Sequence, residues 1–135
     1  MTSELTFTVR TYECDSYGHV NNAVYLQYLE YARWKYLKDI GFDYEGARKA
    51  GYGTYVARVE IDYKQPALTD DTLTITSSPV KKGAVSGTIH QIIMRGTETI
   101  AVANVTWAFV DASGRPVRIP PAFDVPGLSP APSEH

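Results

Sequence analysis

Apolar residues recur with two different periods along the chain, and each period predicts one kind of element. Residues 5–11 alternate apolar and polar side chains, which is the period of two expected for a strand. Between residues 23 and 40 the apolar positions recur every three or four residues, which predicts a helix that Gly41 ends. The apolar stripe of this helix consists of Tyr25, Leu29, Ala32, Tyr36 and Ile40. Such a broad stripe needs a sheet to cover it.

The period changes back to that of strands in the second half of the chain. Residues 42–51 predict only a short, weaker helix or a loop. Four segments rich in Val, Ile, Thr and Tyr follow, separated by turn residues: 55–63, 72–80, 85–94 and 99–110. One strand, one long helix and four consecutive strands form an α+β pattern, in which an antiparallel sheet carries one dominant helix on its face.

The length and composition of the chain indicate that the predicted helix and strands form a single domain. A chain of 135 residues has the size of one ordinary domain. Residues 116–135 hold six of the eight prolines and predict extended or disordered chain. We expect one domain over residues 1–125, followed by a disordered proline-rich tail over residues 126–135.

Net charge, cysteine content and targeting signals indicate which partners and which cell compartment to expect. The formal net charge of −2 provides no general attraction to nucleic acid or to an anionic membrane. A single cysteine, Cys14, cannot form an internal disulfide, which suits a reducing compartment. No apolar stretch is long enough for a membrane helix, and residues 1–8 lack the features of a signal peptide. The sequence predicts a soluble, cytoplasmic protein.

The candidate chemistry lies in the polar loop of residues 12–22, before the long helix. Asp15 places a carboxylate seven residues before the helix, and a helix N-terminus presents unpaired N–H groups that favour a developing oxyanion. A carboxylate there can attack a carbonyl or activate water. These two parts suffice for a thioester, because a thiol with a pKa of about 8.5 leaves without a general acid. The alternative is that Asp15 only caps or brackets the loop.

The run D-x-x-G-H-V-N-N-x-x-Y over residues 15–25, followed by L-x-Y-L-E-Y-A-R, resembles the 4-hydroxybenzoyl-CoA thioesterase family of hotdog proteins. It is also similar to the corresponding run in acyl-ACP thioesterases. The resemblance implies a hotdog fold, in which a five-stranded antiparallel sheet wraps around one long helix. It further implies dimers with a continuous sheet, often paired into tetramers, and an active site at the subunit interface.

The resemblance also implies roles for residues in the loop. Asp15 takes the position of the catalytic nucleophile or base, and the backbone N–H at or near Asn22 would polarise the thioester carbonyl. His19 orients Asp15, contacts the thioester, or only holds the turn. Asn21 and Asn22 are expected to cap the helix. Tyr25 either packs in the core or lines the acyl pocket with its hydroxyl.

Coenzyme A carries phosphates, so a chain with negative net charge needs a local basic cluster to bind it. Lys81 and Lys82 resemble the basic pair that contacts nucleotide phosphates in the family, and a solvated hairpin end is the alternative. Arg58, Lys64 and Arg95 are weaker candidates. His19, His90, His135 and Cys14 have no metal-ligand spacing, so neither a metal nor a cofactor is implied.

The function expected from the sequence is therefore hydrolysis of an acyl-CoA thioester by a homodimer or a dimer-of-dimers homotetramer. Two alternatives stay open at this stage. One is an acyl-ACP thioesterase, which would need a basic surface for the carrier protein. The other is a non-catalytic acyl-CoA-binding protein that kept the fold and lost turnover. The acyl group itself is not predicted.

Overall fold

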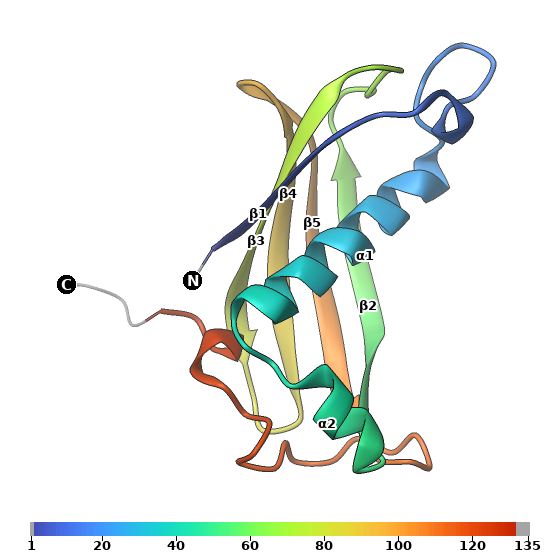
Figure 1. Ribbon diagram of the computed structural model, residues 1–135. Helices are drawn as coiled ribbons and strands as arrows, with labels where there is room; N and C mark the ends of the chain where they lie inside the picture. Colours follow the sequence, from blue (N-terminus) through green and yellow to red (C-terminus); the bar gives the residue numbers. More distant parts are fainter. Residues whose placement is uncertain (1, 132–135) are drawn as a thin grey trace.

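A curved antiparallel sheet of five strands carries one long helix across its concave face in the computed structural model, which describes residues 2–131 (Figure 1). The strands are β1 (Ser3–Thr8), β2 (Gly53–Tyr63), β3 (Thr72–Lys82), β4 (Ser86–Arg95) and β5 (Glu98–Val110). The helices are α1 (Asn22–Asp39) and α2 (Tyr44–Lys49), with short 3-10 turns at Thr11–Glu13 and Pro126–Leu128. The predicted element order and the hotdog arrangement are confirmed.

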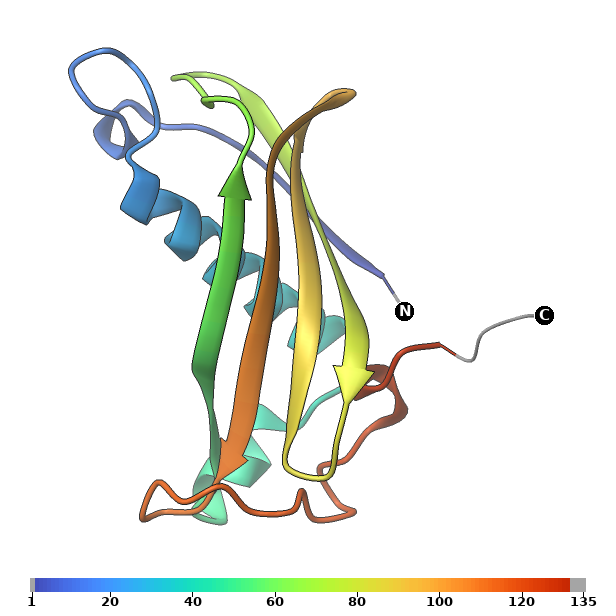
Figure 2. The ribbon, with the colours of Figure 1, turned by 180° about the vertical axis from the view of Figure 1, so that it is seen from behind.

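The sheet is built around two consecutive hairpins. Its strand order is β1-β3-β4-β5-β2, and every neighbouring pair is antiparallel. β3, β4 and β5 follow one another in sequence, whereas β1 joins one edge and β2 joins the other (Figure 2). This order places the end of β2 beside the loop that leads into α1, because both lie at the same end of the sheet (Figure 1).

The long helix α1 begins and ends close to where its sequence predicts. The Asn21 side chain accepts a hydrogen bond from the Ala23 N–H, which caps the first turn as expected. Gly41 adopts a φ of 76°, the left-handed conformation that ends many helices. The buried stripe is Tyr25, Tyr28, Leu29, Ala32 and Tyr36. No helix within residues 2–131 is long and apolar enough to cross a lipid bilayer.

The core lies between α1 and the concave face of the sheet, to which alternate residues of β3, β4 and β5 point. One cluster packs under the first half of α1 and includes Leu73, Ile75 and Ile93. A second cluster surrounds Tyr36 and Phe109 near the end of the helix. The core therefore extends along the length of α1 as two clusters.

β2 differs from the other strands because most of its residues are exposed on both faces. It is an edge strand of 11 residues, so one row of its backbone N–H and C=O groups has no neighbouring strand among residues 2–131. Four apolar side chains of β2 are exposed: Tyr55, Val56, Val59 and Tyr63. A long, apolar, open edge is a ready template for pairing with another strand.

The C-terminal segment corrects the predicted domain boundary at residue 125. Leu128 is only 3% exposed and belongs to the second core cluster. The Tyr36 hydroxyl donates a hydrogen bond to the Gly127 carbonyl, which fixes the same turn to α1. The prolines exclude regular structure, but they do not prevent an apolar side chain from docking. Residues 132–135 of the expected tail lie outside the described residues.

Leu128→Ala should therefore lower the free energy of unfolding by about 2–4 kcal/mol, as expected for truncating a buried leucine. The loss is measured by chemical denaturation monitored by tryptophan fluorescence. Ala131→Ser is the matched control, because Ala131 is exposed and lies three residues further along the same segment. An unchanged denaturation midpoint for Leu128→Ala would show that the segment is not part of the folded core.

Candidate active site

The loop of residues 14–20 before α1 is closed by backbone hydrogen bonds. The Asp15 N–H donates to the His19 carbonyl (2.8 Å), and the Gly18 N–H donates to the Asp15 carbonyl (3.0 Å). Gly18 has a φ of 79°, which glycine adopts without strain. The Val20 N–H donates to the Ala67 carbonyl (2.9 Å), which attaches the loop to the segment after β2. The loop is therefore held in one conformation.

A buried carboxylate, Glu13, anchors the start of this loop to α1 and to the chain that follows β1. It accepts hydrogen bonds from the Arg10 N–H (2.8 Å) and guanidinium, and from the Tyr28 hydroxyl (2.9 Å). Burial alone would raise the pKa of Glu13, but the hydrogen bonds from Arg10 and Tyr28 outweigh it and hold the pKa below its ordinary value. The Glu13 carbonyl accepts from the Asn21 N–H (3.0 Å), so one residue ties both ends of the loop together.

The Asp15 carboxylate brackets its own loop and also faces outward. Its Oδ1 accepts hydrogen bonds from the backbone N–H groups of Tyr17 (2.9 Å) and His19 (3.1 Å). Its Oδ2 has no hydrogen-bond partner among residues 2–131, and the side chain is exposed. The bracketing role considered from the sequence is therefore present, and it leaves one carboxylate oxygen available.

One amide at the start of α1 is unpaired. The Ala23 N–H is used by the Asn21 side chain (3.0 Å), and the Val24 N–H donates to the Asn21 carbonyl (2.9 Å). The Asn22 N–H has no acceptor in the part of the chain that the structure describes. An unpaired N–H in the first turn of an 18-residue helix is a donor with the helix dipole behind it.

Asp15 and Asn22 line the same cavity, which has a volume of about 450 Å³. His19 and Tyr25 also line it, so the structure brings together all the site residues that the motif predicted in this segment. The complete lining is Asp15, His19, Val20, Asn21, Asn22, Tyr25, Tyr63, Lys64, Gln65 and Pro66.

The four residues after and including Tyr63 contribute to this cavity from the other side. The Tyr63 hydroxyl donates to the Asn22 carbonyl (3.0 Å), which fixes the first residue of α1 against the end of β2. Lys64 lines the cavity and contributes a positively charged side chain, although the sequence suggested it only as a weaker candidate for binding phosphate. No motif connects these residues to Asp15, because they meet only when the sheet closes around the helix.

Tyr25 is almost completely buried, and its ring lies 5.3 Å from the ring of Tyr63 at a steep angle. Its hydroxyl oxygen accepts a hydrogen bond from the Ala67 N–H (2.9 Å). Burial raises the pKa of this hydroxyl, so Tyr25 is a neutral group in the cavity wall. Both roles considered from the sequence, packing and lining, apply to this residue.

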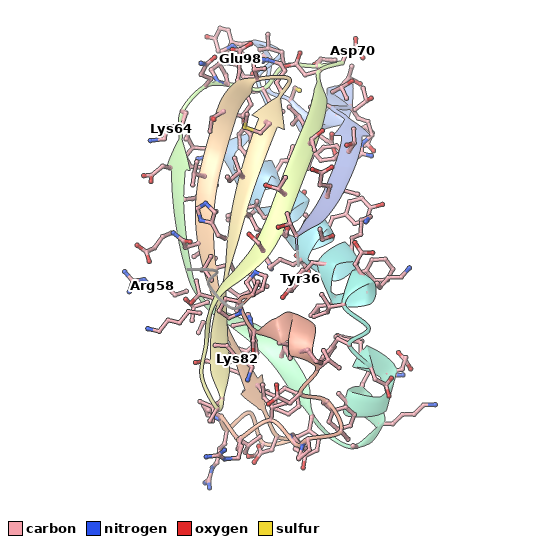
Figure 3. All side chains as sticks on the ribbon, turned by 90° about the vertical axis from the view of Figure 1, so that its left-hand side faces the viewer. Tyr36, Arg58, Lys64, Asp70, Lys82 and Glu98 are labelled. Atoms are coloured by element: carbon pink, nitrogen blue, oxygen red, sulfur yellow. The ribbon has the colours of Figure 1, made fainter. Side chains whose placement is uncertain are left out.

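Lys81 and Lys82 do not lie in this cavity. They end β3 at the opposite end of the sheet from Lys64 (Figure 3). Lys82 forms an ion pair with Asp124 (3.2 Å) and donates to the Gly83 carbonyl (2.8 Å), whereas the side chain of Lys81 is exposed. Within one chain, the predicted phosphate ligands and the predicted catalytic carboxylate are therefore separated.

The cavity combines a carboxylate oxygen that can act as nucleophile or base with an unpaired N–H that can stabilise an oxyanion. Together these groups suit addition to a carbonyl carbon held between them. A leaving group that departs as an anion needs no general acid for this addition and elimination. An acyl thioester has such a leaving group.

Comparison with known proteins agrees with this chemistry. Residues 9–126 match the profile of the thioesterase-like superfamily. The chain is 39% identical over 103 residues to the long-chain acyl-CoA thioesterase FadM of Escherichia coli, covering 76% of each protein. It is 30% identical over 125 residues to the acyl-acyl carrier protein thioesterase ATL3 of Arabidopsis thaliana, covering 87% of this chain and 63% of the plant protein. A probable thioesterase from Bartonella henselae superposes with a TM-score of 0.83 at 26% identity, covering 89% of this chain and 100% of that structure.

Proposed function

This chain belongs to the thioesterase-like superfamily and is a thioester hydrolase, and we propose that it cleaves acyl-CoA to free acid and CoA with Asp15 as the reacting carboxylate. The observation that carries the proposal is the shared cavity: it is lined both by Asp15, whose Oδ2 has no hydrogen-bond partner among residues 2–131, and by Asn22, whose N–H is unpaired there. The narrower assignment to the 4-hydroxybenzoyl-CoA family stays a prediction from the motif.

In the proposed mechanism the thioester carbonyl oxygen accepts a hydrogen bond from the Asn22 N–H, where the positive end of α1 stabilises the oxyanion. Asp15 either removes a proton from a water that adds to the carbonyl carbon or adds to that carbon itself. The tetrahedral intermediate then expels the CoA thiolate as the C–S bond breaks. In the first route the proton held by Asp15 passes to the thiolate; in the second, water hydrolyses the acyl-aspartyl anhydride.

His19 takes a supporting role in this proposal. Its backbone N–H and C=O both bind Asp15, so the residue holds the loop through its main chain. His19 lines the cavity, and we expect its imidazole to contact substrate. Tyr63 fixes the carbonyl of Asn22 and thereby the orientation of the residue whose N–H is the oxyanion donor.

We propose that the active unit is a homodimer formed through the open edge of β2, as the resemblance implies. Two-fold pairing of an edge strand with its own copy is antiparallel, so the start of one β2 meets the end of the other. β3 runs antiparallel to β2, so its last residues, Lys81 and Lys82, lie at the end of the sheet where β2 starts. Pairing would bring them toward the Asp15 cavity of the partner. Lys81 is the exposed member and the better phosphate ligand. Whether two dimers pair further into a tetramer stays a prediction.

The test is release of free thiol from a panel of acyl-CoA substrates: short, medium and long fatty acyl groups and an aryl group. We expect turnover of at least one class, with the length profile identifying the acyl group. Tight binding of every acyl-CoA without thiol release would overturn the hydrolase and favour the non-catalytic alternative.

An acyl carrier protein substrate is the second candidate, and the similarity to the plant enzyme supports it. Matched acyl-CoA and acyl-ACP substrates with the same acyl group separate the two. If kcat/KM is at least tenfold higher on the carrier-protein substrate, acyl-ACP would replace acyl-CoA as the proposed substrate.

A further inference from the structure

A second cavity, of about 380 Å³, lies between the second half of α1 and the start of β2. Helix α1 begins beside the end of β2, where the Tyr63 hydroxyl binds the Asn22 carbonyl, and then crosses the sheet away from that strand (Figure 1). The second cavity shares no lining residue with the cavity of Asp15. Within one chain it is therefore a separate site.

Part of the lining of this cavity is apolar and belongs to the core, and we call this part the floor. It comes from four segments that are distant in sequence and consists of Phe42, Ile89, Trp107 and Leu128. All four belong to the second core cluster and are no more than 8% exposed. A volume of about 300–1,000 Å³ and a mostly apolar lining with few polar groups are typical of small-molecule sites. A ligand that fits this floor carries an apolar chain.

Arg33, on the second half of α1, lines the same cavity and is a half-buried cation with no acidic partner. No carboxylate within residues 2–131 lies within 4.0 Å of its guanidinium. Burial lowers the pKa of Arg33, which reflects the cost of keeping a charge from water without a counter-ion. An anion beside the guanidinium would offset this cost, because opposite charges attract more strongly where water is excluded.

A buried amide fixes the guanidinium and leaves some of its donors free. Nη1 of Arg33 donates to Oε1 of Gln91 (3.1 Å), and Gln91 is 0% exposed. Nε2 of Gln91 donates in turn to the Leu29 carbonyl (3.0 Å) and to the Ser77 hydroxyl (2.9 Å), so the amide cannot rotate without losing both bonds. The other nitrogens of Arg33 have no hydrogen-bond partner among residues 2–131, where no half-buried side chain holds a nitrogen that is both inaccessible and unpaired. These donors are therefore accessible to a ligand.

Glu30 limits how much negative charge this cavity can accept. It lines the cavity one helical turn before Arg33, but its side chain is exposed and forms no ion pair within the described residues. Water screens an exposed carboxylate, so Glu30 offsets only part of the charge of Arg33. One cation with an acid nearby suits a ligand with a single negative charge better than a phosphate ester, which carries about two.

We propose that this cavity binds a free fatty acid, with the carboxylate on the Arg33 guanidinium and the alkyl chain on the apolar floor. A planar guanidinium with free donors matches a carboxylate, which can accept two parallel hydrogen bonds from it. A free carboxylic acid is the product of thioester hydrolysis, so the inference rests on the proposed function for the source of the ligand but not for the site. Product bound here leaves the Asp15 cavity of the same chain open.

The test uses the fluorescence of Trp34 and Trp107, because both tryptophans of the chain line this cavity. The probes are decanoate and decanol, which has a chain of the same length without the charge. We expect the wild type to bind decanoate roughly tenfold or more tightly than decanol, as expected for a hydrogen bond to a charged group. A decanoate that carries bromine on its chain should quench the tryptophan fluorescence, which would locate the chain in the cavity.

Two substitutions on α1 should change the preference for decanoate in opposite directions. Arg33→Met removes the charge and keeps an unbranched apolar side chain, so this variant should bind decanoate no better than decanol. Glu30→Gln removes the nearby negative charge without touching Gln91, so it should tighten decanoate binding by about two- to threefold and leave decanol binding unchanged. The Glu30→Gln result tests the site even if loss of the bond to Gln91 prevents Arg33→Met from folding.

Arg118→Met is the matched control for loss of an arginine. Arg118 also forms no ion pair within the described residues, but it is exposed and does not line the cavity. We expect this variant to prefer decanoate over decanol as strongly as the wild type does. A similar loss of preference in Arg118→Met and Arg33→Met would show that general charge, and not the cavity, attracts the acid.

Equal affinity of the wild type for decanoate and decanol would overturn the role of Arg33, and so would a preference that Arg33→Met and Glu30→Gln leave unchanged. Binding of brominated decanoate without quenching would place the acid outside the cavity. Failure of this site is distinguishable from failure of the proposed function. A protein that releases thiol but binds no decanoate would lose the site and keep the hydrolase. One that binds decanoate in the cavity but releases no thiol would keep the site and lose hydrolysis as the source of its ligand.

Discussion

Asp15→Asn is expected to lower kcat for thioester hydrolysis by about 10³-fold while leaving acyl-CoA binding within a fewfold of wild type. The reason is that the change removes the nucleophile or base and little else. The asparagine Oδ1 can still accept the hydrogen bonds that Asp15 accepts from the Tyr17 and His19 N–H groups, so the loop keeps its conformation. Single-turnover thiol release and equilibrium binding of the same acyl-CoA measure the two effects separately.

Asp70→Asn is the control for removing a negative charge at the end of the sheet where Asp15 lies. Asp70 is exposed there (Figure 3) and has a φ of 71°, a conformation that asparagine tolerates. We expect wild-type turnover from this variant. Wild-type turnover from Asp15→Asn, in a protein with an unchanged denaturation midpoint, would remove Asp15 from the mechanism and leave the helix terminus without its proposed nucleophile.

Glu13→Gln is expected to lower the free energy of unfolding at pH 7 by about 2–3 kcal/mol, since it leaves donors of Arg10 facing an amide N–H₂ in place of a carboxylate oxygen. Arg10 is half exposed, which keeps the loss below that of a fully buried pair. Because Glu13 holds both ends of the Asp15 loop, kcat should also fall, by roughly tenfold. Urea denaturation and thiol release measure these changes.

The stability difference between wild type and Glu13→Gln should depend on pH in one direction. The folded-state pKa of Glu13 lies below its unfolded value, so its contribution is complete above the unfolded pKa of about 4.3 and is lost as pH falls through the folded pKa. The two proteins should therefore converge in acid. Glu45→Gln, which removes an exposed carboxylate from α2, should follow the wild-type curve. A difference that stays constant down to pH 3 would contradict the role of the ionised carboxylate.

The fold was largely predictable because its elements follow local patterns. α1 buries one stripe at helical spacing, begins after an asparagine cap and ends at a glycine with positive φ, so periodicity and both termini agree. β3 and β4 alternate buried and half-exposed residues, as half-buried strands do. The burial of Leu128 was not predicted, because a single side chain that docks after several prolines leaves no periodic pattern in the sequence.

The site was predictable only where it is local in sequence. Asp15 and Asn22 lie within one loop and helix start, so one motif contains both. Tyr63 and Lys64 join them through closure of the sheet, a contact between residues about 40 positions apart that no spacing reveals. Glu13 was missed for a different reason: an acid beside a catalytic candidate looks like loop polarity until its burial and its bonds to Arg10 and Tyr28 are known.

The unequal lengths of the two sheet edges have a consequence for how far assembly can proceed. Once two β2 strands pair, the edges that remain are the outer edges of two β1 strands, each only six residues long. Glu4, Thr6 and Thr8 are exposed along that strand, and Ser3 is bonded to Asp39 of α1. A short edge with a charge on it recruits further strands poorly. If β2 pairs as proposed, we therefore expect growth of the sheet to stop after that single addition, which would protect the protein from linear polymerisation into fibres.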